Sequence, residues 1–195
     1  LLSDVTTFRL GKSIVSVAGL LSFSPVHRRI RMTHVTILPR NDKGEVISAL
    51  SIVGLFTSRA LAEECSTIPL IRKKFTEIVS SEGFVENTHD YKSVANIVDS
   101  LPKDEALSLD THSLRSIVTS VLDVATSSET VVSIWADPQS RGLSVLVVML
   151  RERFSTSMRE NIAEFIKDNF KNSPTTSEYH LDITNRPVVR LYYHV

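Results

Sequence analysis

The sequence predicts an α+β fold built from antiparallel sheets with helices on one face. Three observations predict it: stretches rich in β-branched residues come in pairs, turn residues separate the members of each pair, and segments with apolar residues at helical spacing lie between the pairs. The chain has 195 residues, enough for one large domain or two small ones. We expect two units, a mixed α+β lobe over residues 1–109 and a second unit over residues 110–195.

The first lobe is expected to contain a β-hairpin over residues 29–56. Its two β-branched stretches, 29–38 and 45–56, flank a turn in which Gly44 can supply the positive φ that such turns need. Upstream, the chain permits one more strand, because small apolar residues alternate there at Ile14, Val15 and Val17. The lobe therefore opens with antiparallel β-structure.

Two helices are expected after the hairpin. The first begins at Pro69, since Pro suits the first helical position, and Gly83 is placed to end it. Its apolar face is formed by Ile71, Phe75, Ile78 and Val79. The second helix runs from about residue 88 to residue 100, and Pro102 stops its continuation.

The second unit begins with a predicted helix that Asp110 can cap. Apolar residues at helical spacing follow: Leu114, Ile117, Val118, Val121 and Leu122. Two strands come next, 130–136 and 143–150. A capping-box pattern, Ser157 with Glu160, then predicts a second helix. The inward residues of that helix are expected to be Met158, Ile162, Phe165, Ile166 and Phe170.

Two more strands, 177–184 and 188–195, complete the second unit. Each is expected to present one apolar face, with Tyr179, Leu181 and Ile183 on the first strand and Val189, Leu191, Tyr193 and Val195 on the second. The resulting order is α-β-β-α-β-β. This is the ferredoxin-like β-α-β-β-α-β order with its first strand moved to the end, a permuted ferredoxin-like unit.

The sequence contains no local motif for binding a nucleotide or a metal ion. Its six glycines are never closer than eight residues apart, so no glycine-rich phosphate loop can be written. No two histidines have helical spacing, and the single cysteine, Cys65, has no partner for a chelating pair. We therefore expect no cofactor in this chain and no metal bound through a sequence-local motif.

Three features that invite a catalytic reading are better explained as structural. Cys65 is expected to be an ordinary small side chain, because Glu63 and Glu64 would raise the pKa of its thiol. His89 and Asp90 are expected at a helix N-terminus, where the helix dipole favours Asp. Trp135 is expected to pack from a strand onto a helix.

Charge and cysteine content limit the partners and the compartment. Lys plus Arg and Asp plus Glu both number 22, so the neutral chain has no electrostatic reason to concentrate nucleic acid or acidic lipid. No apolar run approaches the ~18 residues of a membrane-spanning helix. One cysteine fits a reducing compartment, which we expect to be the cytoplasm. The chain starts without Met and stops inside a predicted strand, so we expect a piece of a longer protein.

Basic side chains supply the candidate ligand-binding or interface residues. They lie in two segments, His27, Arg28 and Arg29 before the hairpin and Arg72 in a helix. A guanidinium suits a carboxylate of another domain or a bound anion. Lys73 and Lys74, next to Arg72, are expected on a solvated face.

Six separated motifs follow one another along the chain. In order they are SPVHRR at 24–29, GLFTS at 54–58, IPLIRKK at 68–74, SLPKDE at 100–105, RERFST at 151–156 and RPVVRL at 186–191. Together they resemble the N-terminal half of the large bacterial NAD-specific glutamate dehydrogenases. The resemblance covers about residues 20–195, nearly the whole chain. It implies a region of ACT-like and PAS-like modules upstream of the catalytic domain, with the unit at 110–195 being ACT-like.

The resemblance implies that the parent enzyme is an NAD-dependent oxidoreductase that converts L-glutamate and water to 2-oxoglutarate and ammonia. None of the family's catalytic motifs falls in this chain, so we expect a non-catalytic regulatory or assembly fragment. Its expected partners are the remaining domains and other subunits of an oligomeric parent. An alternative is a module that senses a free amino acid through Arg28, Arg29 and Arg72. A stand-alone anion-binding adaptor is a third reading, supported only by the basic N-terminal segment.

Overall fold

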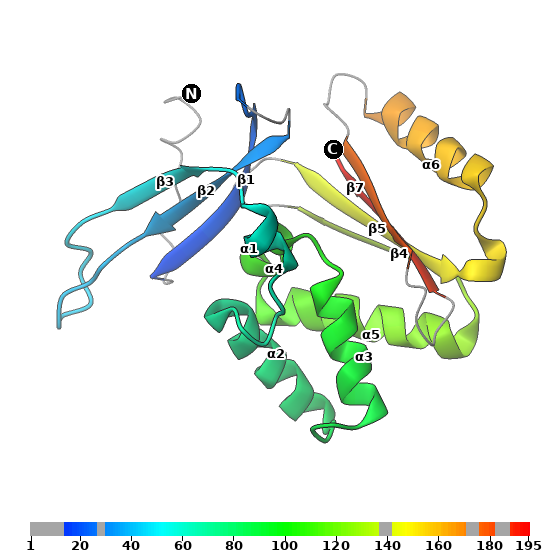
Figure 1. Cartoon of the computed structure of the whole chain (residues 1–195), viewed down its shortest axis with the longest axis horizontal. Helices are drawn as coiled ribbons and strands as arrows, with labels where there is room; N and C mark the ends of the chain where they lie inside the picture. The colour runs from blue at the N-terminus through cyan, green and yellow to red at the C-terminus, as the bar shows by residue number, and fades with distance from the viewer. Residues whose placement is uncertain (1–13, 27–29, 137–141, 171–175, 182–187) are drawn as a thin grey trace. The chain divides into compact units, whose positions relative to one another are not determined.

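The computed structural model describes residues 14–26, 30–136, 142–170, 176–181 and 188–195. The chain divides into two compact units, Leu1–Thr111 and His112–Val195. Within the described residues each unit has its own antiparallel sheet, three-stranded in the first and four-stranded in the second (Figure 1). The α+β class with antiparallel sheets is therefore confirmed.

The sheet of the first unit has the order β1-β2-β3. Its strands are β1 (Val15–Phe23), β2 (Arg31–Ile37) and β3 (Leu50–Gly54), so the chain does form a strand upstream of the hairpin. The second hairpin strand is shorter than expected because a wider turn occupies its predicted start. In that turn the Asn41 side chain accepts hydrogen bonds from the amides of Lys43 and Glu45, and Gly44 has a φ of 81°.

Four helices follow where the sequence indicated two: α1 (Ser58–Ala62), α2 (Pro69–Glu82), α3 (His89–Asp99) and α4 (Lys103–Ser108). The two additional helices, α1 and α4, are only five and six residues long, too short to show a helical period. The signals read for α2 are present, with Pro69 in its first turn and Gly83 as a left-handed C-cap. In α3, the Thr88 hydroxyl accepts a hydrogen bond from the Tyr91 amide.

The second unit consists of α5 (Thr111–Ser127), β4 (Val131–Ala136), β5 (Leu143–Leu150), the 3-10 turn η1 (Arg151–Arg153), α6 (Thr156–Asn169), β6 (Thr176–Leu181) and β7 (Val188–His194). Its strands lie in the order β4-β5-β7-β6, and every neighbouring pair is antiparallel. This is the order that a ferredoxin-like sheet takes when its first strand moves to the end of the chain. The predicted permuted topology is confirmed.

The core between α6 and the sheet comes from alternate residues of the two central strands. Val145, Val147 and Met149 of β5 pack there with Val189, Leu191, Tyr193 and Val195, the apolar face expected of the last strand. Ile162, Ala163 and Ile166 of α6 cover them. The expected face of Tyr179, Leu181 and Ile183 lies outside the side chains that the structure describes.

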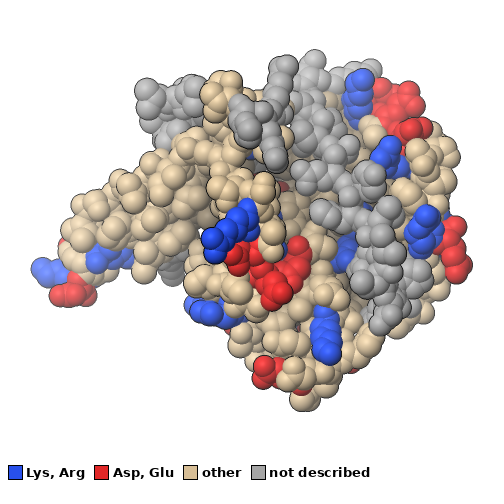
Figure 2. Space-filling model, in the orientation of Figure 1, with Lys and Arg blue, Asp and Glu red and all other residues tan. Residues whose placement is uncertain are grey.

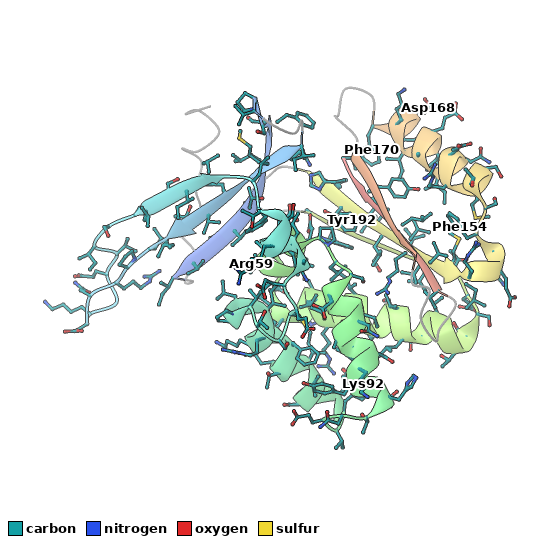
Figure 3. All side chains as sticks on the ribbon, viewed as in Figure 1. Arg59, Lys92, Phe154, Asp168, Phe170 and Tyr192 are labelled. Carbon is teal, nitrogen blue, oxygen red and sulfur yellow. The ribbon has the colours of Figure 1, made fainter. Side chains whose placement is uncertain are left out.

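The predicted start and inward face of α6 are partly wrong. The cap is Ser155, whose hydroxyl accepts a hydrogen bond from the Met158 amide, so the helix begins two residues before the expected capping box. Ile166 and Ile162 do face the core, but Phe165 is 68% exposed and Met158 and Phe170 are also exposed. Phe154 and Phe170 lie at the two ends of this helix (Figure 3).

Candidate functional site

The second unit carries a row of buried polar side chains on the sheet face opposite α6. Arg190, Tyr192 and His194 alternate along β7 with the residues that pack under α6, and Ser144 pairs with His194 in the β5–β7 register. All four are buried. We call these four residues the polar row, and among the described residues it is the densest group of buried polar side chains in this unit.

Specific contacts fix the polar row. The Ser144 hydroxyl and His194 Nδ1 are 3.1 Å apart. A Cβ on Gly142 would lie 2.6 Å from His194 Nε2, so only glycine fits beside the imidazole. Trp135 of β4 reaches across the small Ser144 to the ring of Tyr192, with centroids 5.9 Å apart. Trp135 therefore packs on a tyrosine of its own sheet, and the expected packing on a helix stays a prediction.

The chemistry of the polar row suits binding rather than covalent catalysis. A Ser–His hydrogen bond is half of a nucleophile–base arrangement, but the polar row contains no carboxylate that could orient His194 as a general base. A guanidinium, an imidazole and two hydroxyls are groups that hydrogen-bond a carboxylate. Sequence reasoning did not select these residues. The only available signal was the spacing of Arg190 and His194 within an otherwise hydrophobic closing strand.

The structure places only one of the predicted site residues. Arg72 is exposed in the first turn of α2, where its amide donates to the Ile68 carbonyl. His27, Arg28 and Arg29 lie outside the described residues. The structure therefore does not bring the predicted set together, and a shared role for these four residues stays a prediction.

Lys74 has a different role from the one expected. Lys73 is exposed, but Lys74 is half-buried and its Nζ donates to the carbonyls of Ala106 at 3.0 Å and Leu107 at 2.8 Å. Burial lowers the pKa of Lys74 to about 8, although the nearby Asp110 carboxylate opposes the shift. The lysine thus joins α2 to the last turn of α4, and the expectation of a solvated face is wrong for this residue.

Cys65 is an inert structural residue. Its side chain is buried, and burial together with the Asp99 carboxylate raises the thiol pKa to about 12. Asp99 also accepts a hydrogen bond from the Cys65 amide at 2.6 Å and lies 3.4 Å from Lys103 Nζ. The structural reading of Cys65 is confirmed, with Asp99 rather than the preceding glutamates as the responsible carboxylate.

His89 and Asp90 lie exposed in the first turn of α3, as expected for a helix N-terminus. In the part of the chain that the structure describes, no three His, Cys, Asp or Glu side chains gather as metal ligands would, and no helix has the length and hydropathy to cross a membrane. Figure 2 shows cationic and anionic side chains interspersed over the visible face.

The fold and the strand order define the class of protein to which the second unit belongs. Residues 132–195 match the family model "Glutamate dehydrogenase, ACT2 domain", so this unit contains an ACT domain. Residues 68–127 match "Glutamate dehydrogenase, helical motif 1". The two matches follow each other along the chain and together cover more than half of it.

Curated relatives point to the same family. The chain is 29% identical over 160 residues to the NAD-specific glutamate dehydrogenase of Pseudomonas aeruginosa, covering 82% of this chain and 10% of that protein. It is 25% identical over 162 residues to the enzyme of the same name from Halomonas elongata, covering 80% of this chain and 10% of that protein. The chain belongs to the family of large NAD-specific glutamate dehydrogenases, and it spans about a tenth of the length of these relatives.

The boundary between the two family matches differs from the boundary between the two compact units of the structure. The helical motif ends at residue 127, so it includes α5, whereas the contacts group His112–Ser127 with the sheet of the second unit. The matched ACT2 region starts at residue 132, and its described residues contribute four strands and a single α-helix, α6. A ferredoxin-like unit has two helices over its sheet, and the ACT2 region by itself supplies one of them.

Proposed function

We propose that this chain is a non-catalytic regulatory or assembly region of an NAD-specific glutamate dehydrogenase. The parent reaction converts L-glutamate, water and NAD to 2-oxoglutarate, ammonia and NADH, and NAD binds elsewhere in the parent. The partners of the region are the remaining domains and neighbouring subunits of a cytoplasmic oligomer. The observation that carries this proposal is the succession of a helical motif and an ACT domain of that family within one chain.

The test of the non-catalytic role is direct. The isolated chain, mixed with L-glutamate and NAD, is expected to produce no heat of reaction in a calorimeter and no NADH absorbance. The full-length enzyme at the same molar concentration provides the positive control. Turnover by the isolated chain at a rate above its heat-inactivated sample would contradict the proposal.

A second candidate function, sensing of a free amino acid, is favoured by the polar row. Arg190 offers a cationic donor for a carboxylate, and His194, Ser144 and Tyr192 add an imidazole and two hydroxyls on the same face of the sheet. The basic side chains Arg28, Arg29 and Arg72 are alternative contacts from the first unit.

Thermal-shift measurements with each of the twenty amino acids test this candidate. A true effector is expected to raise the melting temperature in a saturable way, because a ligand that binds the folded state stabilises it by mass action. Tyr192→Phe removes one hydroxyl of the polar row, and Arg72→Ala removes the exposed guanidinium, so the variant that weakens the shift locates the site. If no amino acid raises the melting temperature, the sensing function is rejected.

A further inference from the structure

The sheet face that α6 covers is left open at β4. Val132 pairs with Val147 and Ile134 pairs with Val145, and directly opposed residues of an antiparallel pair point to the same face. Val145 and Val147 are buried under α6, but Val132 is 56% exposed and Ile134 is 63% exposed. The part of this face over β5 and β7 is therefore packed, and the part over β4 is an uncovered apolar floor.

The flank of α6 beside this floor is also apolar. The helix connects β5 to β6, which run parallel with β7 between them, and such crossovers are right-handed. The hand of the crossover decides which flank of α6 faces β4. It is the flank about a quarter turn before Ile162 and Ile166, counted around the helix axis in the direction in which the residue number increases. Met158 and Phe165 occupy that position, and both are exposed. They form a wall beside the floor.

The floor and the wall lack the charges that normally protect such a surface. The edge strand β4 contains no charged residue and no proline. On α6 the charged residues lie on the outer side and on the flank away from β4: Arg159, Glu160, Glu164, Lys167 and Asp168. We call Val132, Ile134, Met158 and Phe165 the open face. Its composition is that of an interface rather than of a solvated surface.

One helix fits the open face. Packed helices lie about 8–10 Å apart, and strands about 4.8 Å apart, so a helix beside α6 would lie directly over β4. The longer helices of the described chain have already buried their apolar stripes, through Ile71 and Phe75 in α2, Val94 and Val98 in α3, and Leu114 and Val118 in α5. The described part of the ACT2 match contains no second α-helix, and the relatives are about ten times longer than the chain.

We propose that the open face binds an amphipathic helix of the parent polypeptide from outside residues 1–195, which completes the two-helix layer of the ACT domain. The helix contacts Val132 and Ile134 with an uncharged apolar stripe and packs beside Met158 and Phe165. This inference rests on the proposed assembly role and specifies one surface for it. Labelling of the surface does not depend on effector response or turnover, so the two proposals can fail separately.

Cysteine labelling of the full-length enzyme tests the inference. Ile134→Cys and Phe165→Cys probe the open face, and Val85→Cys, in the loop after α2, is the matched control, since Val85 is 67% exposed. The buried thiol of Cys65 gives a slow background that the parental enzyme measures. We expect maleimide to label the two open-face cysteines at least tenfold more slowly than Cys at position 85. Rates within twofold of the control for both positions would overturn the inference.

A crosslinker then identifies what covers the surface. Benzophenone-maleimide attached at position 134 is irradiated, and the crosslinked peptides are identified by mass spectrometry. A crosslink to a helical segment outside residues 1–195 is the expected result. A crosslink to residues 131–170 of a second copy would show pairing between edge strands and would overturn the inference, as would a crosslink to a segment that is not helical.

Discussion

Strands β3 and β7 both contain several apolar residues and both lie in antiparallel sheets. β3 is exposed at every position except Gly54, whereas β7 is buried at every position. The difference in burial comes from the position of each strand in its sheet. β7 lies between two strands with α6 over one face, whereas β3 is the edge of a three-stranded sheet. Composition indicates that a segment is a strand, and topology decides how much of it is covered. In the first unit, side-chain hydrogen bonds such as those from Lys74 of α2 to the carbonyls of α4 add to the apolar contacts between the helices.

Truncation of one residue in each strand gives the largest expected difference. Leu191→Ala in β7 removes a fully buried side chain and should lower the free energy of unfolding by about 2–5 kcal/mol. Ile52→Ala in β3 removes a half-exposed side chain and should cost less than about 1 kcal/mol. Urea unfolding measures both, and the fluorescence of Trp135, the single tryptophan, follows the second unit. Equal losses would break the comparison between the strands.

The paired lysines of α2 test the role of hydrogen bonds in the first unit. Lys74→Met leaves the Ala106 and Leu107 carbonyls without their donor and should cost about 1–3 kcal/mol, whereas the exposed Lys73→Met should cost less than about 0.5 kcal/mol. The difference is read from far-UV circular dichroism in urea.

The same lysine predicts a pH dependence. The unfolded lysine keeps its proton up to about pH 10.5, while the folded one releases it near 8, so the unfolded state binds more protons between these values. The free energy of unfolding of the native chain should therefore gain a contribution from Lys74 that rises between about pH 8 and pH 10.5, and Lys74→Met should lack this contribution. A parallel course of the two curves would contradict the predicted burial.

The start of α6 gives a smaller effect in the second unit. Ser155→Ala removes the hydroxyl that accepts a hydrogen bond from the Met158 amide, and it should lower the free energy of unfolding by about 1 kcal/mol. Ser157→Ala changes an exposed residue two positions later and should cost less than about 0.5 kcal/mol. If Ser157→Ala lowered the free energy of unfolding more than Ser155→Ala, the helix would begin where the capping-box pattern indicated.

The smallest expected effect is the titration of His34 in the first sheet. This buried histidine, hydrogen-bonded to Ser51, has a pKa that burial lowers. The unfolded chain therefore binds a proton at a higher pH than the folded chain, and stability should fall as pH drops below about 6.5. His34→Asn should remove this slope, measured by urea midpoints between pH 7.5 and 5. NMR titration of the His34 ring should place its midpoint below 6.5.

Local patterns predicted the elements well wherever one short signal decides the structure. Pro69 and Gly83 bound α2, and the order of strands and helices was enough to predict the sheet topology of the second unit. It was harder to predict which face of a helix is buried. Phe165 fits the apolar period of α6, but it is 68% exposed, because the period does not show which apolar positions find a partner.

The candidate site was less predictable than the fold. The polar row needs β5 and β7 to be neighbours, so that Ser144 meets His194 fifty residues later, and no sequence spacing shows this pairing. Lys74 was assigned to solvent because its neighbours Arg72 and Lys73 are charged, yet its partners are carbonyls more than thirty residues away. Carbonyl groups occur at every residue, so the sequence gives no sign of which ones will be left to accept a donor.

The measurement that tests the central claim most directly compares the full-length enzyme with a version lacking residues 1–195. Oligomer mass by light scattering, response to amino acids and NAD-dependent turnover of glutamate are recorded for both. We expect the truncated enzyme to retain turnover and to lose either its native oligomer mass or its response to effectors. Unchanged mass and unchanged response would contradict a regulatory or assembly role for this region.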